Sequence, residues 1–146
     1  MEYVFDYSEV EKEQKKFDPI EDGDYDGIVE EAKVDTNQKG NKYINVKIRL
    51  NNKRILFDRL NVESENGIAV EIAMKKFKSM VYFGIDNPQA KFSTFEQMAM
   101  TLKDTPVKVY YKNKGKDDRG YDKFSLTYKK TDMKKTAQPV KAGAIY

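Results

Sequence analysis

One segment of the chain alternates between apolar and polar residues more strictly than any other. Between residues 43 and 50 every second side chain is aliphatic, a period of two that is typical of a β-strand with one buried face. The aliphatic positions are Ile44, Val46, Ile48 and Leu50. Asn51-Asn52 follows, and because asparagine tolerates the left-handed conformation of tight turns, we expect the chain to return as a strand over residues 53–60.

Shorter runs of the same alternation predict three more strands. They cover residues 25–35, 107–112 and 121–129, and a charged loop containing two glycines, at 113–120, joins the last two. In the last strand we expect Phe124, Leu126 and Tyr128 to point inward. The sequence therefore predicts three strands in the first half of the chain and two near its end.

Helical spacing replaces strand spacing between the third and fourth strands. Asn66 can cap a helix over residues 67–83 with Gly84 as its terminator, and a shorter helix is predicted over 95–102. The expected buried stripe of the longer helix is Ile68, Ile72, Ala73, Phe77, Met80 and Val81. Five strands with a helix between the third and fourth is the order of the oligonucleotide-binding (OB-fold) barrel. We therefore predict a mainly β fold of this class with a short second helix.

Composition divides the chain into an acidic leader at residues 1–16, the barrel domain at 17–130, and a basic tail at 131–146 that is expected to be disordered. Residues 1–31 hold 12 acidic and 3 basic residues, whereas the remainder holds 12 acidic and 24 basic ones. A basic body favours a polyanionic partner through phosphate neutralisation, although an excess of lysine is also common on a solvated surface.

The chain offers little for catalysis or metal binding. Because it contains no histidine and no cysteine, it lacks the usual general base and thiolate, and we expect neither enzyme activity nor a cofactor. Asp22–Gly27 matches the first half of a calcium-binding loop, but the twelfth position is Lys33, where a glutamate is needed. A two-metal nuclease could use Asp58, Glu63 and Glu65, yet these carboxylates lack a defined partner. We therefore expect no metal site.

The first six residues lack the basic and apolar runs of a signal peptide, and no apolar stretch approaches the length of a membrane span. The absence of cysteine gives no hint of an oxidising compartment. We expect a soluble cytoplasmic protein that does not enter a membrane.

The side chains that face away from the predicted core indicate a partner. They are Tyr43, Lys47 and Arg49 on the second strand, Lys108, Tyr110 and Lys112 on the fourth, and Tyr121 and Lys123 on the fifth. Aromatic rings interleaved with cations stack unpaired bases and hold phosphates, as binding to single-stranded DNA requires. A solvated sheet face is the alternative for any one strand, but recurrence on three strands favours binding.

The third strand leaves two alternatives open. Either Arg54, Leu56 and Asp58 or Ile55, Phe57 and Arg59 face outward, and a shift of one residue exchanges them. We include Arg54 among the DNA-binding candidates.

Several short blocks in order resemble a bacteriophage-encoded family long described as a domain of unknown function. These blocks are Phe17–Ile20, Gly23–Asp26, Glu31–Val34, Lys42–Val46 and Phe57–Asn61. The family is similar to single-stranded DNA-binding proteins of phage replication and recombination modules. The resemblance implies a protein that coats single strands in the host cell cytoplasm, with phage recombinase or replication proteins as further partners and self-association expected.

Two other hypotheses remain open. The same tyrosines could form a protein interface, which would make the chain a recombinase loader or another interaction module. The acids of residues 1–31 could compete with DNA for the basic face, in the way that acidic tails of cellular single-strand binders act in recruitment.

Overall fold

The computed structural model describes residues 2–4 and 20–136. Most of the expected leader at 1–16 and the last ten residues of the expected tail lie outside this part of the chain. The described strands and helices are β1 (Gly23–Thr36), β2 (Lys42–Leu50), β3 (Ile55–Leu60), α2 (Gly67–Gly84), β4 (Ile85–Asp86), α3 (Phe95–Leu102), β5 (Pro106–Lys116), β6 (Asp122–Lys129) and β7 (Lys135–Thr136). None of the described helices is long and apolar enough to cross a membrane.

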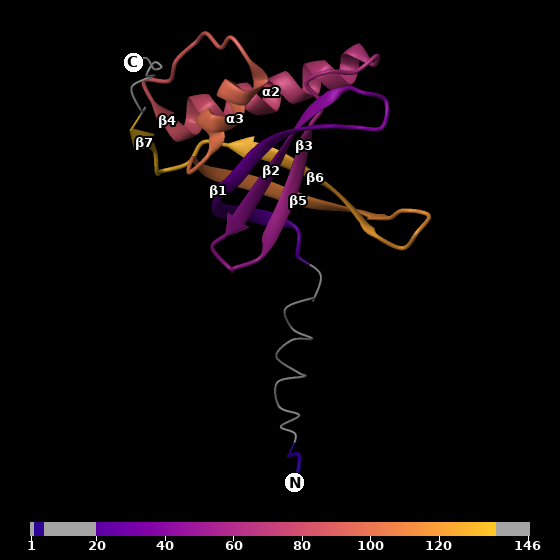
Figure 1. The fold of residues 1–146 in the computed structure, drawn as a ribbon. Coiled ribbons are helices and arrows are strands. Elements are labelled where there is room, and N and C mark those ends of the chain that lie inside the picture. The colour runs from indigo at the N-terminus through magenta and orange to yellow at the C-terminus, as the bar shows by residue number, and fades with distance from the viewer. Residues whose placement is uncertain (1, 5–19, 137–146) are drawn as a thin grey trace.

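Five strands form one antiparallel sheet in the order β3-β2-β1-β5-β6 (Figure 1). β1, 14 residues long, is the central strand and lies between β2 and β5. Its first part pairs with β5, from Gly23 opposite Tyr111 to Ile28 opposite Pro106. Its pairing with β2 runs on to Thr36 opposite Lys42. The predicted elements and their order are therefore observed, with a mainly β architecture.

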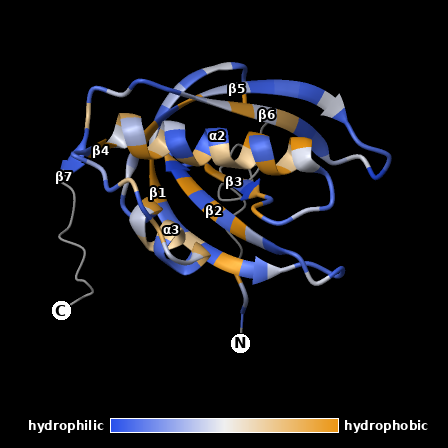
Figure 2. Cartoon of the chain, turned by 90° about the horizontal axis from the view of Figure 1, so that it is seen from above, coloured by the Kyte–Doolittle hydropathy of each residue, from blue (hydrophilic) through white to orange (hydrophobic). Residues whose placement is uncertain are grey.

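The hydrophobic core lies between one face of this sheet and the two helices. Ile44, Val46 and Ile48 of β2 are fully buried, as the alternation predicts. α2 and α3 lie across the strands in the view of Figure 2, and both contribute to the same core. The opposite face of the sheet is left without a covering helix in the described part of the chain.

The buried stripe of α2 is narrower than expected. It consists of Ala73, Phe77, Met80, Val81 and Gly84. Ile68 and Ile72, which the sequence places in the stripe, are exposed by 68% and 51%. That expectation is wrong because, at about 100° per residue, the five buried positions span an arc of about 100° around the helix, and Ile68 and Ile72 lie at least about 80° outside it.

Glycine is required at position 84, the last residue of α2, because of close packing and not because of a left-handed conformation. A Cβ atom there would clash with the carbonyl oxygen of Pro106 and with the Cγ2 atom of Thr105. The end of α2 therefore lies directly against the start of β5, and only glycine permits this approach.

The sheet does not close into the expected barrel, because β3 and β6 are its edges and do not pair with each other. Both edge strands contact α2 instead. Asp58 of β3 is buried, and its carboxylate accepts a hydrogen bond from the Tyr128 hydroxyl of β6 at 2.7 Å. Lys76 Nζ of α2 donates to both oxygens of the same carboxylate, at 3.1 and 3.2 Å. These side-chain hydrogen bonds thus link β3 and β6 in place of backbone pairing.

Burial raises the pKa of Tyr128 well above its ordinary value, and the neighbouring Asp58 carboxylate adds to the shift. The neutral phenol is therefore the favoured form, as a hydrogen-bond donor to a buried carboxylate requires.

The first six residues of the expected tail pack onto the domain. Thr131 is buried, and β7 pairs in parallel with β4. Lys135 Nζ donates to the carbonyl oxygens of Thr101 and Lys103, at 2.8 and 2.6 Å. A cation is favourable at this place because the C-terminus of α3 carries unpaired carbonyl groups. Burial lowers the pKa of the Lys135 ammonium group.

Candidate nucleic-acid interface

The side chains that point away from the helices form a surface that we call the open face. Residues directly opposite each other in antiparallel strands share one face, so the register assigns its members. They are Asp24, Asp26, Ile28, Glu31, Lys33 and Asp35 of β1, Tyr43, Asn45, Lys47 and Arg49 of β2, Ile55, Phe57 and Arg59 of β3, Lys108, Tyr110 and Lys112 of β5, and Ser125, Thr127 and Lys129 of β6.

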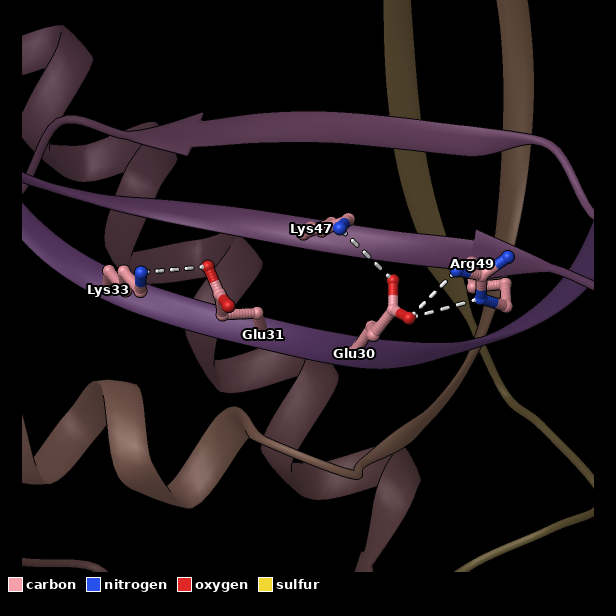
Figure 3. Close-up of polar contacts among 5 residues, drawn as sticks. All are labelled: Glu30, Glu31, Lys33, Lys47 and Arg49. Atoms are coloured by element: carbon pink, nitrogen blue, oxygen red, sulfur yellow. Dashed lines mark hydrogen bonds and ion pairs between the residues drawn. The ribbon is translucent and has the colours of Figure 1, made fainter.

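The two predicted cations of β2 are engaged by a carboxylate of β1 (Figure 3). Arg49 donates to Glu30 Oε1 from Nη2 at 2.8 Å and from Nε at 3.2 Å. Lys47 Nζ lies 3.5 Å from Glu30 Oε2. The hydrogen bonds from Arg49 lower the pKa of the Glu30 carboxyl, which stays ionised. Lys47 and Arg49 are therefore present on the open face, but with part of their charge neutralised.

A β-bulge explains why Glu30 reaches both cations. The register between β1 and β2 shifts between Val29 and Glu31, which leaves Glu30 without a partner on β2. The extra residue of a bulge is re-aimed relative to a regular strand. Here its side chain points from β1 toward β2, between Lys47 and Arg49 (Figure 3).

Tyr43 lies under an arginine from β3. The guanidinium carbon of Arg59 is 3.7 Å from the centroid of the Tyr43 ring, a cation–π contact. Tyr43 is half-buried, so one side of this predicted stacking residue is occupied. The exposed guanidinium group of Arg59 is the surface that remains available at this position.

Of the two faces that β3 could turn outward, the structure exposes the one that carries Phe57. Leu56 and Asp58 are buried, whereas Ile55, Phe57 and Arg59 are exposed, with 53% of Phe57 accessible. Arg54 lies in the turn before β3 and is half-buried. Arg54 therefore lies on the same side of the strand as Leu56. Phe57, whose orientation the sequence left undecided, lies on the open face.

The predicted residues of β5 lie together on the other half of the open face. Lys112 is exposed, Lys108 is half-buried, and Tyr110 between them is 36% exposed. Asp24 pairs with Lys129 at 3.1 Å across the Tyr110 position. Lys129 Nζ also lies 5.9 Å from the Tyr110 ring centroid. The Tyr110 ring thus has a cation beside it on β6.

Tyr121 and Lys123 belong to the hairpin that joins β5 and β6, which projects from the body of the domain (Figure 1). Tyr121 is 68% exposed, and its backbone closes the turn with Asp117. Lys123 is exposed and continues the outward alternation of Ser125. Phe124, expected to point inward, is partly exposed and stacks on Tyr111 at a ring separation of 5.2 Å.

The acidic candidates occupy structural positions. Asp22 accepts a hydrogen bond from the backbone N–H of Asn113 at 2.7 Å, and most of the calcium-like segment belongs to β1. Glu63 accepts one from the backbone N–H of Lys42 at 2.8 Å. Within residues 2–4 and 20–136, no three acidic side chains gather closely enough to hold a metal ion.

Sequence reasoning missed the acids of the open face. β1 places Asp24, Asp26 and Glu31 on this surface, in addition to the bulged Glu30. The signal was present in the alternation of residues 24–28, where every second side chain is outward. β2 and β5 flank β1, so these acids separate two groups of cations by about 10 Å, two strand spacings.

The model of a family described as "Protein of unknown function (DUF669)" matches residues 3–139. No curated protein matches the chain.

Proposed function

The chain belongs to the DUF669 family, and from this premise we propose that it is a non-catalytic single-stranded DNA-binding protein that uses the open face of its sheet. Its role on this proposal is to coat single strands during phage replication or recombination, in the cytoplasm of the host cell. Recombinase or replication proteins would then be further partners, and self-association is part of the same expectation.

One observation carries the proposal. The open face combines exposed aromatic rings, Phe57 on β3 and Tyr110 on β5, with cations on strands beside each of them. Lys47 lies opposite Phe57, and Lys129 lies near Tyr110. Rings accept bases by stacking without regard to sequence, and the neighbouring cations meet the phosphates.

The strand order supports an OB-fold origin for this surface. Counted within the five-stranded sheet the order is 3-2-1-4-5, and α2 follows the third strand. OB-folds are partly open barrels that bind oligonucleotides on the face of strands two and three and with adjoining loops. We propose that the domain is an OB-fold in which α2 and the bridge from Asp58 to Tyr128 occupy the place of the closing strand pair.

A protein partner is a second candidate, favoured by a different surface. Ile68 and Ile72 are largely exposed one helical turn apart on α2, in the layer opposite the open face. Apolar side chains grouped in this way are common where another protein docks. Such a contact would leave the open face accessible, so the two functions are compatible.

Fluorescence anisotropy of a labelled 20-nucleotide oligo-dT and of its duplex with oligo-dA, at several salt concentrations, tests the proposal. We expect tight binding to the single strand that weakens steeply with salt, and much weaker binding to the duplex. Absence of single-strand binding at low salt would contradict the proposal and leave the protein-interaction function.

A further inference from the structure

An open hollow of about 770 Å³ lies at one end of the open face. Two loops form it, the turn from β1 to β2 and the segment that joins β3 to α2, together with Tyr43 and Arg59. Its volume falls in the range of sites that bind small molecules, about 300 to 1,000 Å³. A single nucleobase is smaller than this space, so the hollow can accommodate one base with its sugar.

One wall of the hollow is suited to stacking. Arg59 is held over the Tyr43 ring at 3.7 Å, and both residues line the hollow. Arginine guanidinium planes and tyrosine rings are the groups on which proteins stack unpaired bases. A base that entered the hollow would extend the stack that Tyr43 and Arg59 begin.

The remaining lining is polar and rich in amides. Asn37 is fixed in orientation because its Oδ1 accepts from the backbone N–H groups of Lys39 and Asn41, at 2.9 and 3.0 Å. Its NH₂ group is thereby left as a donor. Asn41 and Asn61 are half-buried in the lining and add further donors. Amide and ammonium donors of this kind match acceptor atoms on a base edge.

Glu65 is the one carboxylate in the lining of this hollow. A carboxylate accepts two hydrogen bonds from adjacent donors, and among the DNA bases only guanine carries adjacent N1–H and N2–H groups. Guanine also presents the acceptors O6 and N7, which suit the amides and Lys39. Thymine offers one donor, and adenine and cytosine each offer an amino group without a neighbouring ring N–H.

We propose that the hollow receives one guanine base of the bound single strand and gives DNA binding a preference for guanine. Arg59 and Tyr43 stack the base, Glu65 accepts from its Watson–Crick edge, and the amides donate to its acceptors. This inference rests on the proposed single-strand binding and adds base recognition to it.

The test compares 20-nucleotide strands in a competition assay. One strand is all thymine, and in the others every fourth thymine is replaced by guanine, adenine, cytosine or hypoxanthine, which lacks the N2 amino group. The wild type is expected to bind the guanine strand on the order of tenfold more tightly than the others. Glu65→Gln should reduce this preference to less than threefold, measured as the ratio between the guanine strand and the all-thymine strand for the same variant. Glu71→Gln, an exposed glutamate on α2 outside the hollow, is the matched control and should keep the full preference.

Equal affinity of the wild type for all strands would overturn the guanine site while leaving single-strand binding intact. Retention of the preference in Glu65→Gln would overturn it as well. Failure to bind any strand would instead contradict the proposed function itself. The all-thymine strand also reports whether the variant is folded, because an unfolded variant would not bind it.

Discussion

The two halves of the open face differ in how far their cations are already engaged. On β2 and β3, Lys47 and Arg49 interact with Glu30, and Arg59 lies over Tyr43. On β5 and β6, Lys108 and Lys112 form no ion pair within the part of the chain that the structure describes. The first half holds fixed, partly neutralised groups, whereas the second holds two lysines of β5 without an ion pair beside Lys129 of β6, which pairs with Asp24.

This difference suggests that the two halves bind different parts of a DNA strand. Fixed planar groups suit bases, whose stacking depends on orientation, whereas free lysines suit phosphates, whose attraction depends on charge. The acids of β1 lie between the halves and engage cations on both sides, Glu30 those of β2 and Asp24 the Lys129 of β6. These acids belong to the acidic residues 1–31, so part of that segment does lie on the basic surface.

Removal of one aromatic ring from either half should have the largest effect. Tyr110→Ala and Phe57→Ala should each cost about 1 to 3 kcal/mol of binding to oligo-dT, since each ring supplies one stacking surface. Tyr82→Ala serves as the control because this tyrosine is 70% exposed on α2, away from the sheet surface. Anisotropy titrations measure all three, and an unchanged affinity for both ring variants would remove the stacking mechanism.

Tyr128→Phe should loosen the bridge that holds the two edges of the sheet together. The variant leaves the buried Asp58 carboxylate without one hydrogen bond, which costs about 1 to 3 kcal/mol of unfolding free energy. Urea unfolding measures the change, with Tyr82→Phe as the control. The raised pKa of Tyr128 predicts that its stabilisation is fully present below about pH 10, the ordinary tyrosine value, and is lost as the pH rises further. The stability difference between wild type and variant should therefore shrink in strong alkali.

Salt dependence should separate the two halves of the open face. Lys112→Ala removes a free cation and should lower the slope of log affinity against log salt by about 0.7, the value for one phosphate of a single strand. Lys47→Ala removes a cation that already lies 3.5 Å from Glu30, so its slope should change by less. Equal slope changes would show that the ion pair does not reduce the contribution of Lys47.

Glu30→Gln should change the affinity for oligo-dT the least, and it should raise this affinity. Loss of the carboxylate frees Lys47 and Arg49 for phosphates, so the affinity for oligo-dT should rise by about two- to threefold at low salt and less at high salt. Glu31→Gln removes an acid that pairs with Lys33 on β1 itself and with neither cation of β2, and it serves as the control. A weaker affinity of Glu30→Gln would indicate that the carboxylate orients the two cations for binding.

The pattern of apolar and polar residues was enough to predict features that depend on one strand or one helix alone. The period of two over residues 44–50 predicted the burial of β2, and the helix boundaries follow from caps such as Asn66, whose side chain accepts from Ile68 N–H. The face of β3 could not be decided because Asp58, a buried acid, interrupts the apolar pattern. Its burial depends on Lys76 and Tyr128, which come from distant segments.

Features that depend on several strands at once could not be predicted from the sequence. Apolar alternation specifies which face is buried but not whether two edge strands pair, so the expected barrel closure was wrong, whereas the order of strands and helices along the chain was predicted. The bulge at Glu30 and the acids beside β2 likewise depend on register. β4 and β7 contain two residues each, too few for a periodic signal.

Photocrosslinking of an oligonucleotide that carries 5-iodouracil, followed by mass spectrometry of the crosslinked peptides, tests most directly whether the open face binds DNA. We predict crosslinks at Phe57 and Tyr110, and loss of each crosslink in the matching alanine variant. Crosslinks confined to α2, with none on the five-stranded sheet, would contradict the assignment of the open face as the DNA-binding surface.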